Sequence, residues 1–211
     1  MLAGRTIVSL SSGTPQEARE TRSWAALHEI AFLAGAIMVP PSMVGRPEAL
    51  FFYSGDQAVF DVNLHSLRSV GGDARYLGED AALALLYNTS LLGLYWSTIA
   101  GFLHAAALVG SAGVRAETFA PVAQEFLSVP RDIMAYCAGQ IDAGHYPGDA
   151  GRLAMDAIAM DHLRKASEAQ GVGTRIPDFL RRLAQDAIGK GHRDDSLTSV
   201  IEIIKQETED A

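Results

Sequence analysis

The 211-residue sequence contains a single cysteine, Cys137, and only 17 lysine and arginine residues against 25 aspartate and glutamate residues. One cysteine excludes an intramolecular disulfide framework and a multi-cysteine zinc site, and it favours a cytoplasmic protein. The net charge of -8 disfavours a nucleic-acid partner, because sequence-independent binding to the phosphates of DNA or RNA needs clustered basic residues. The six histidines show no ligand spacing, so we expect no metal site.

Charged residues are also absent from Thr89 to Val114, and Leu91 to Val109 is apolar on nearly every helical face. A segment of this length is long enough to span a bilayer. Flanking positive charge is sparse, however, and His104 places a polar ring inside the run. We therefore favour a helix that other helices bury, in a large or oligomeric core, over a membrane span.

The first third of the chain has the pattern of an α/β fold. Residues 15–33 have helical spacing, and short runs of strand length lie at Arg5–Leu10, Gly35–Val39, Leu50–Ser54 and Asp73–Leu77. Continuous apolar strands separated by helices are typical of a parallel sheet covered on both faces. The sequence therefore predicts an α/β segment over residues 1–79.

From residue 80 onward the pattern is helical only. A helix at Asp80–Gly110 would be roughly 45 Å long at 1.5 Å per residue, so it needs partners beyond its own domain. Further helices are predicted at Glu117–Ala143, Asp149–Gln170, Pro177–Gly189 and Ser196–Gln206. We expect an all-α dimerisation domain with a long interdomain helix over residues 80–211.

Four segments carry a family resemblance: Leu2–Pro15 (LAGRTIVSLSSGTP), Gly35–Gly55 (GAIMVPPSMVGRPEALFFYSG), Leu86–Val114 (LYNTSLLGLYWSTIAGFLHAAALVGSAGV) and Gly191–Ser196 (GHRDDS). In this order they resemble the NADPH-dependent imine reductases, relatives of the β-hydroxyacid and 6-phosphogluconate dehydrogenases. The resemblance implies a Rossmann domain, then a long interdomain helix and a helical domain that wraps around a second subunit. It also implies reduction of C=N to an amine with NADPH as the cofactor.

The Gly-rich turn of a dinucleotide site, G-x-G-x-x-G, does not occur in the sequence. Such a turn lets backbone N–H groups hold the pyrophosphate. Gly71-Gly72 comes closest, but it lacks the third glycine and we interpret it as a turn. The resemblance begins partway through the Rossmann domain, which predicts an incomplete Rossmann sheet in either a piece of a longer enzyme or a short relative. NADPH is expected to bind weakly or not at all.

Asn88 aligns with a protic residue, often Asp, that points at the substrate imine in the family. An amide does not titrate near neutral pH, so Asn88 can only hydrogen-bond or orient a water. The alternative is that Asn88 satisfies backbone groups near a helix start. Leu92 and Trp96 share its face by i, i+4, i+8 spacing and would border the substrate, although core packing explains Trp96 almost as well.

Asp156 interrupts an otherwise apolar helical stretch. The resemblance implies that a second subunit supplies this helix and closes the active-site cleft with it, which makes Asp156 the candidate acid and Met155 a lining residue. The alternative is an exposed polar stripe that Asp156 shares with Asp149 and Arg152.

Ser11, Ser12 and Gly13 follow the first strand at its carboxyl end, where open α/β sheets place ligands. The resemblance implies that this loop lies near the nicotinamide. A helix N-cap with Pro15 in the first turn is a sufficient alternative.

The expected function is that of an imine reductase. The chain would supply the half of such an enzyme that binds the substrate and forms the dimer, with a small imine, amine or carbonyl ligand and a homodimeric assembly. The alternative is a non-redox dimer that uses the inter-subunit cleft to bind, cyclise or isomerise such a compound. The missing phosphate-binding turn is the feature that separates the two.

Overall fold

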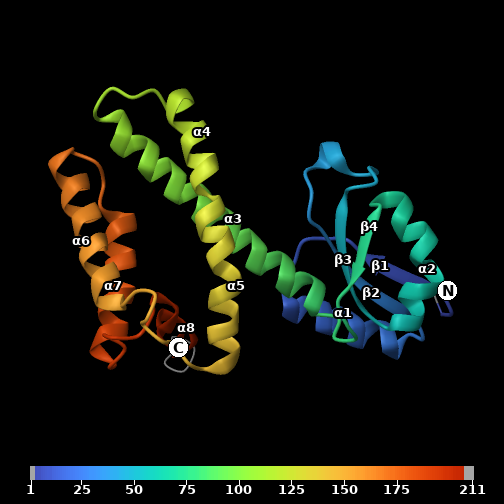
Figure 1. The fold of residues 1–211 in the computed structure, drawn as a ribbon. Coiled ribbons are helices and arrows are strands. Elements are labelled where there is room, and N and C mark those ends of the chain that lie inside the picture. Colours follow the sequence, from blue (N-terminus) through green and yellow to red (C-terminus); the bar gives the residue numbers. More distant parts are fainter. Residues whose placement is uncertain (1–2, 207–211) are drawn as a thin grey trace. The chain divides into compact units, whose positions relative to one another are not determined.

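The computed structural model describes residues 3–206 (Figure 1). It divides into two compact units, Met1–Ser97 and Thr98–Ala211. The first unit is built on one four-stranded sheet whose strands neighbour one another in chain order: β1 (Thr6–Ser9), β2 (Ala31–Ile37), β3 (Leu50–Gly55) and β4 (Asp73–Tyr76). A short sheet followed by helices confirms the expected fold class.

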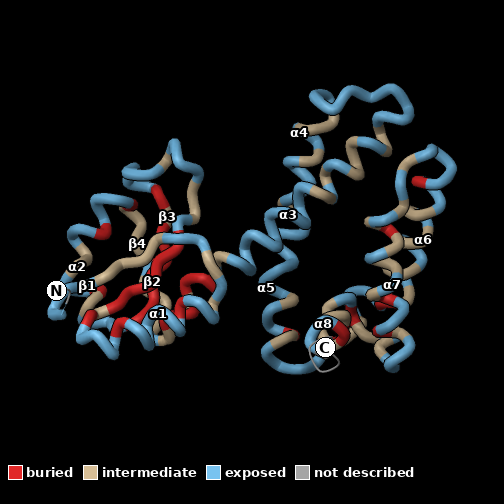
Figure 2. The backbone as a smooth tube through the Cα atoms, turned by 180° about the vertical axis from the view of Figure 1, so that it is seen from behind, coloured by how far each residue is buried: buried red, intermediate tan, exposed pale blue. Residues whose placement is uncertain are grey.

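Helices cover both faces of this sheet, as the apolar strands predicted. Alternate residues of β2 divide between two apolar clusters, because successive side chains of a strand point to opposite faces. Phe32, Ala34 and Ala36 pack with α1 (Pro15–Leu27) and the start of α3 (Leu83–Gly110). Leu33 packs on the other face with residues of α2 (Gln57–Val70), and Figure 2 shows these buried strand residues in red.

The sheet is mixed, so the expectation of a parallel sheet was wrong. β1 pairs with β2 and β3 with β4 in parallel, but β2 and β3 are antiparallel. A parallel neighbour requires a crossover that is usually a helix. The segment between β2 and β3 contains Pro40 and Pro41 and forms only a 3-10 turn, η1 (Pro41–Met43), so the chain reverses direction.

The first helix is shorter than predicted, because α1 ends at Leu27 and β2 begins at Ala31. Glu29 adopts a left-handed backbone conformation with φ 55° and turns the chain into the strand. The apolar residues from Ile30 onward therefore belong to the sheet. Periodicity does not distinguish a short buried strand from the end of a buried helix, which is why the boundary was missed.

The second unit consists of helices. After the C-terminal part of α3 come α4 (Ala116–Phe126), α5 (Ser128–Ala143), α6 (Leu153–Ala169), α7 (Arg175–Gly189), a 3-10 turn η2 (Leu197–Val200) and α8 (Ile201–Gln206). The single helix predicted at Glu117–Ala143 is two helices that meet at Leu127. Pro130 lies in the first turn of α5, where its missing N–H costs nothing, and it favours the break.

The buried core of the second unit lies between α6, α7 and α8. It contains Leu153, Ala184, Ala187 and Ile203, and α6 and α7 pack side by side (Figure 1). By contrast, α4 and α5 are mostly exposed within the single chain (Figure 2). His104 of α3 lies 3.1 Å from the Ser167 hydroxyl of α6 and so ties these two helices together.

The helix α3 is the described helix that is long and apolar enough to cross a membrane. None of its most apolar 18-residue stretch is buried within the single chain. Much of the apolar surface of α3 therefore remains accessible within the described chain.

Close packing leaves no room for a side chain at Gly71 or Gly72. A Cβ at Gly72 would lie 2.3 Å from the backbone oxygen of Pro47, and one at Gly71 would lie 2.1 Å from the Phe51 ring. The glycine pair therefore lets the chain pass from α2 into β4 tightly against the loop before β3.

Candidate functional site

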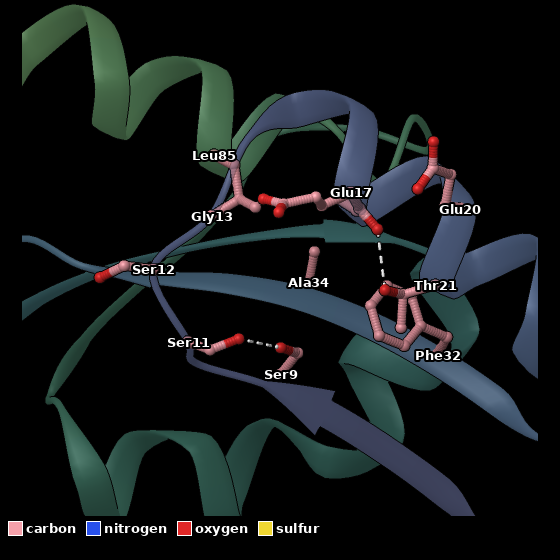
Figure 3. Close-up of a pocket in the computed structure, with 11 residues that line it drawn as sticks. Ser9, Ser11, Ser12, Gly13, Glu17, Glu20, Thr21, Phe32, Ala34 and Leu85 are labelled. Carbon is pink, nitrogen blue, oxygen red and sulfur yellow. Dashed lines mark hydrogen bonds between the residues drawn. The ribbon is translucent and has the colours of Figure 1, made fainter.

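A cleft of about 340 Å³ opens beside the carboxyl end of β1 in the first unit. Hydroxyl groups of Ser9, Ser11 and Ser12 line one side, and Phe32 and Ala34 of β2 form an apolar floor (Figure 3). The Ser9 and Ser11 hydroxyl oxygens lie 2.9 Å apart in a hydrogen bond. The cleft combines an apolar floor with hydroxyl groups along one edge, which suits a small ring with a few polar substituents.

The N-terminus of α1 forms part of the cleft and is already capped. Thr14 is the N-cap residue, with Pro15 in the first turn as expected, and its backbone N–H donates to Glu17 Oε2 at 2.6 Å. The Glu17 N–H donates in turn to the Thr14 hydroxyl at 3.2 Å. The Thr14 N–H and the Thr14 hydroxyl, which both donate to the Glu17 carboxylate, lower the pKa of Glu17, so a negative carboxylate occupies the helix N-terminus.

Gly13 lies between this carboxylate and the start of α3. A Cβ there would be 2.9 Å from Glu17 Oε2 and 3.7 Å from Leu85 Cδ1 (Figure 3). Leu85 lines the cleft, so α3 contributes directly to its wall.

Asn88 is half-buried and lies one helical turn beyond Leu85. Residues three apart on a helix are surface neighbours, so Asn88 lies next to the cleft wall. Its Nδ2 donates a hydrogen bond to the thioether sulfur of Met38, at 3.3 Å. The alternative role for Asn88, satisfying backbone groups, is not what the structure shows.

Leu92 and Trp96 follow Asn88 on α3, and both side chains are exposed. The Trp96 side chain is 62% accessible and its ring contacts Tyr95 edge to face, with centroids 4.9 Å apart. Core packing within the chain therefore does not account for Trp96. A large exposed indole one turn beyond an exposed leucine is a surface suited to an apolar ligand or a second chain.

Asp156 belongs to α6 in the second unit and is half-buried. Within residues 3–206 its carboxylate has no hydrogen bond or ion pair, and burial raises its pKa. Arg152 pairs with Asp194 at 3.3 Å instead, so the predicted polar stripe holds no Arg152–Asp156 pair. The neighbouring Met155 is exposed. Asp156 is a carboxyl group that holds its proton to a higher pH than usual.

Within the part of the chain that the structure describes, no three His, Cys, Asp or Glu side chains are placed to hold a metal ion. The sequence analysis missed Ser9, Glu17, Thr21 and Leu85 as lining residues of the cleft. A signal for Glu17 was present, because T-P-Q-E has the spacing of a capping box. Leu85 carries no signal apart from its position in an apolar helix.

An α/β unit with a cleft at a strand end, joined through a long helix to a helical unit, is the arrangement of elements that the resemblance to imine reductases implies. Residues 80–206 match the family model described as "NADPH-dependent reductive aminase-like, C-terminal domain". The chain is 32% identical to the NADPH-dependent reductive aminase of Aspergillus oryzae over 207 residues, which is 97% of this chain and 70% of that protein.

Solved structures give the same result. The imine reductase of Bacillus cereus is 34% identical with a TM-score of 0.91, over 97% of this chain and 71% of that chain. The reductive aminase of Aspergillus terreus, solved with NADPH4, cyclohexanone and allyl amine, is 33% identical with a TM-score of 0.87, over 96% and 70% of the two chains. The chain belongs to the family of NADPH-dependent imine reductases and reductive aminases.

The described residues fit only one end of NADPH. The hydroxyl groups and the apolar floor of the cleft are compatible with an uncharged nicotinamide and its ribose. The phosphates do not fit here, because the N-terminus of α1 is occupied by the Glu17 carboxylate and Glu20 also lines the cleft. Residues 3–206 therefore offer no phosphate contact at the N-terminus of α1.

Proposed function

We propose that this protein binds a small imine at the cleft of the first unit and takes part in its reduction to an amine. Asn88 supports the proposal, because it lies one helical turn beyond Leu85, which lines the cleft, and the resemblance implies a substrate-facing residue at this position. When bound, NADPH supplies the hydride that the carbon of C=N accepts.

The chain's own residues bind and orient the substrate and deliver a proton. The apolar floor of Phe32 and Ala34 holds the hydrocarbon part of the ligand away from water. Asn88 makes a hydrogen bond to the reacting nitrogen but does not titrate, so it is not the acid. We propose that Asp156 of a second copy of the chain donates the proton to the imine nitrogen, supported by its raised pKa and its carboxylate without an ionic partner within residues 3–206.

We further propose that the protein works as a homodimer. Large apolar side chains are exposed along α3, α4 and α5, among them Leu103, Val122, Phe126 and Ile133. Such a surface is larger than a monomer in water usually leaves exposed, and we propose a second copy of the chain as the partner that covers it.

The test is product analysis with deuterium-labelled cofactor. A cyclic imine and NADPH deuterated at the transferred position, both at millimolar concentration, should give an amine that carries one deuterium on the former imine carbon. Asn88→Leu should lower the rate about tenfold or more. The absence of amine product, with the imine still bound, would contradict reduction.

That outcome would favour the second candidate function, a dimer that binds, cyclises or isomerises an imine, amine or carbonyl compound without redox chemistry. Its supporting observation is the Glu17-capped helix, which leaves no phosphate site in the described cleft.

A further inference from the structure

The segment Gly191–Ser196 (GHRDDS), which lies between α7 and η2, closes the N-terminus of α6. The Leu153 N–H at the start of α6 donates to the backbone carbonyl of Asp195 at 2.7 Å. The next N–H, that of Ala154, donates to the backbone carbonyl of Arg193 at 3.1 Å. The N-cap side chain of α6 makes no capping hydrogen bond, so backbone carbonyls of Gly191–Ser196 take its place. We call this segment the capping loop.

A side-chain hydrogen bond inside the capping loop fixes the residue that caps α6. The Nδ1 atom of His192 lies 2.8 Å from Oδ2 of Asp195, and both residues are half-buried. A carboxylate has no hydrogen, so Nδ1 carries the proton and donates. Asp195 therefore accepts from His192 through its side chain and from Leu153 through its backbone.

The capping loop is also packed against the loop that precedes α6. The Ser196 N–H donates to the backbone carbonyl of Tyr146 at 2.9 Å. The Tyr146 ring meets the His192 imidazole edge to face, with centroids 6.3 Å apart. A Cβ at Gly148 would clash with the backbone oxygen of Asp194, so the two loops approach each other without an intervening side chain. His192 thus lies where both loops and the start of α6 meet.

The turn that this loop caps is the one that carries Asp156. The Asp156 N–H donates to the Arg152 carbonyl at 3.3 Å, a bond that exists only while this turn is helical. Burial raises the pKa of the Asp156 carboxyl group. If the turn unwinds, the carboxyl group gains water and its pKa falls toward the ordinary value of 3.8.

We propose that His192 is a positioning residue: through Asp195 it keeps the first turn of α6 formed and thereby holds Asp156 in place for proton transfer. The part of this inference that concerns the reaction rests on the proposed function, because that function gives Asp156 its role. The part that concerns the cap is tested without substrate or cofactor. His192 acts only through the capping loop and is assigned no contact with the reacting atoms.

Amide hydrogen exchange of the full chain, without any ligand, tests the cap directly. His192→Leu removes the donor to Asp195, so the amides of Leu153 and Ala154 should exchange faster by about tenfold. His192→Asn supplies an amide N–H close to the position of Nδ1 and should restore slow exchange. The Ala184 amide, in the core of α7, should exchange as in the parent protein and shows that the fold is intact.

A carbon-13 NMR titration of the aspartate carboxyl groups gives a second measurement on the same proteins. The pKa of Asp156 should be lower in His192→Leu than in the parent protein, because the carboxyl group is then more hydrated. If His192→Leu does not fold, Asp195→Asn replaces it. This variant keeps an acceptor oxygen for His192 but loses the charge, so the amides of Leu153 and Ala154 should exchange about threefold faster.

Turnover of a cyclic imine with NADPH connects the cap to the reaction. His192→Leu should lower kcat about tenfold and change KM by less than about twofold, because it displaces the acid without touching the substrate. In an Asp156→Asn background the same substitution should not lower kcat further, since the group that it positions is gone. Asp194→Asn is the matched control from the same loop. It removes only the exposed pair with Arg152, at 3.3 Å, and should leave exchange and kcat unchanged.

Exchange at Leu153 and Ala154 as slow in His192→Leu as in the parent protein would overturn the capping role. Faster exchange with an unchanged kcat, or an equal loss of kcat with and without Asp156, would overturn the positioning role in the reaction. If the parent protein forms no amine, the proposed function fails and this positioning role fails with it. The exchange result then still decides whether His192 maintains the cap.

Discussion

The Tyr146 hydroxyl donates a hydrogen bond to the carboxylate of Glu202 and so ties the loop before α6 to α8. Lys205 contacts the same carboxylate at 3.0 Å. Tyr146 and then Lys205 lower the pKa of Glu202 below its ordinary value of 4.5. Because the folded-state pKa is lowered, these bonds stabilise the fold above the unfolded pKa, and the stabilisation is lost as the pH falls through the folded pKa.

Tyr146→Phe should therefore lower the thermal midpoint near neutral pH and reduce the loss of stability below about pH 4.5. Thermal unfolding between pH 7 and pH 3 measures both effects. Glu117→Gln, which removes an exposed partner of Arg115, is the control and should change neither. If Tyr146→Phe loses as much thermal stability as the parent protein between pH 7 and pH 3, the hydrogen bond contributes nothing to stability.

Two leucines of the first unit give a matched test of the core. Leu33 of β2 is 0% exposed and Leu27 at the end of α1 is 83% exposed. Leu33→Ala should destabilise the fold by about 2–5 kcal/mol, and Leu27→Ala should change it by less than about 0.5 kcal/mol. Denaturant unfolding measures both. Similar losses in the two variants would contradict the assignment of Leu33 to the sheet core.

The exposed apolar surface predicts the oligomeric state. Sedimentation at micromolar concentration should show only a dimer or a larger species, and Leu103→Glu, which places a charge on α3, should shift the protein toward monomer. Glu117→Gln serves again as the surface control. A parent protein that is a stable, well-folded monomer would contradict the proposal.

Substitutions of two aspartates of α6, Asp156 and Asp161, should change the stability of the fold in opposite directions. Burial raises the pKa of Asp156, so its charge costs stability above the ordinary value of 3.8. Hydrogen bonds and charges of Lys165 and Arg164 lower the pKa of Asp161, so its charge stabilises the fold in the same pH range. At neutral pH, Asp156→Asn should raise the thermal midpoint and Asp161→Asn should lower it.

The rate of amine formation also distinguishes Asp156 from Asp161. Asp156→Asn should lower the rate of amine formation by about a hundredfold or more, the usual contribution of a general acid, and Asp161→Asn should leave it unchanged. If Asp156→Asn is as active as the parent, the proton comes from water or from the substrate.

Much of the fold was predictable because apolar runs of strand length and long helical patterns are local signals. The antiparallel pairing of β2 and β3 was not predicted, because it depends on the short connection through Pro40 and Pro41, which forms only the 3-10 turn η1. The end of α1 was not predicted either, because the residues after Glu29 are equally apolar in a helix or a strand. Only the tertiary contacts of Phe32 and Leu33 decide between the two.

The site was predictable only in part. Asn88 and the loop Ser11–Gly13 follow from motifs that resemble a family. The Met38 contact joins residues 50 positions apart, and no spacing rule reveals a hydrogen bond of that kind. The desolvation of Asp156 likewise depends on what packs around α6.

We propose that the described residues form the substrate side of an imine reductase, with no site for the cofactor phosphates in the described cleft. Calorimetric titration of the full chain with NADPH and, separately, with protonated 3,4-dihydroisoquinoline tests both parts of this proposal. We expect saturable binding of the imine and a dissociation constant for NADPH weaker than about 0.1 mM. A low-micromolar dissociation constant for NADPH would contradict it, because a phosphate site would then exist in this chain.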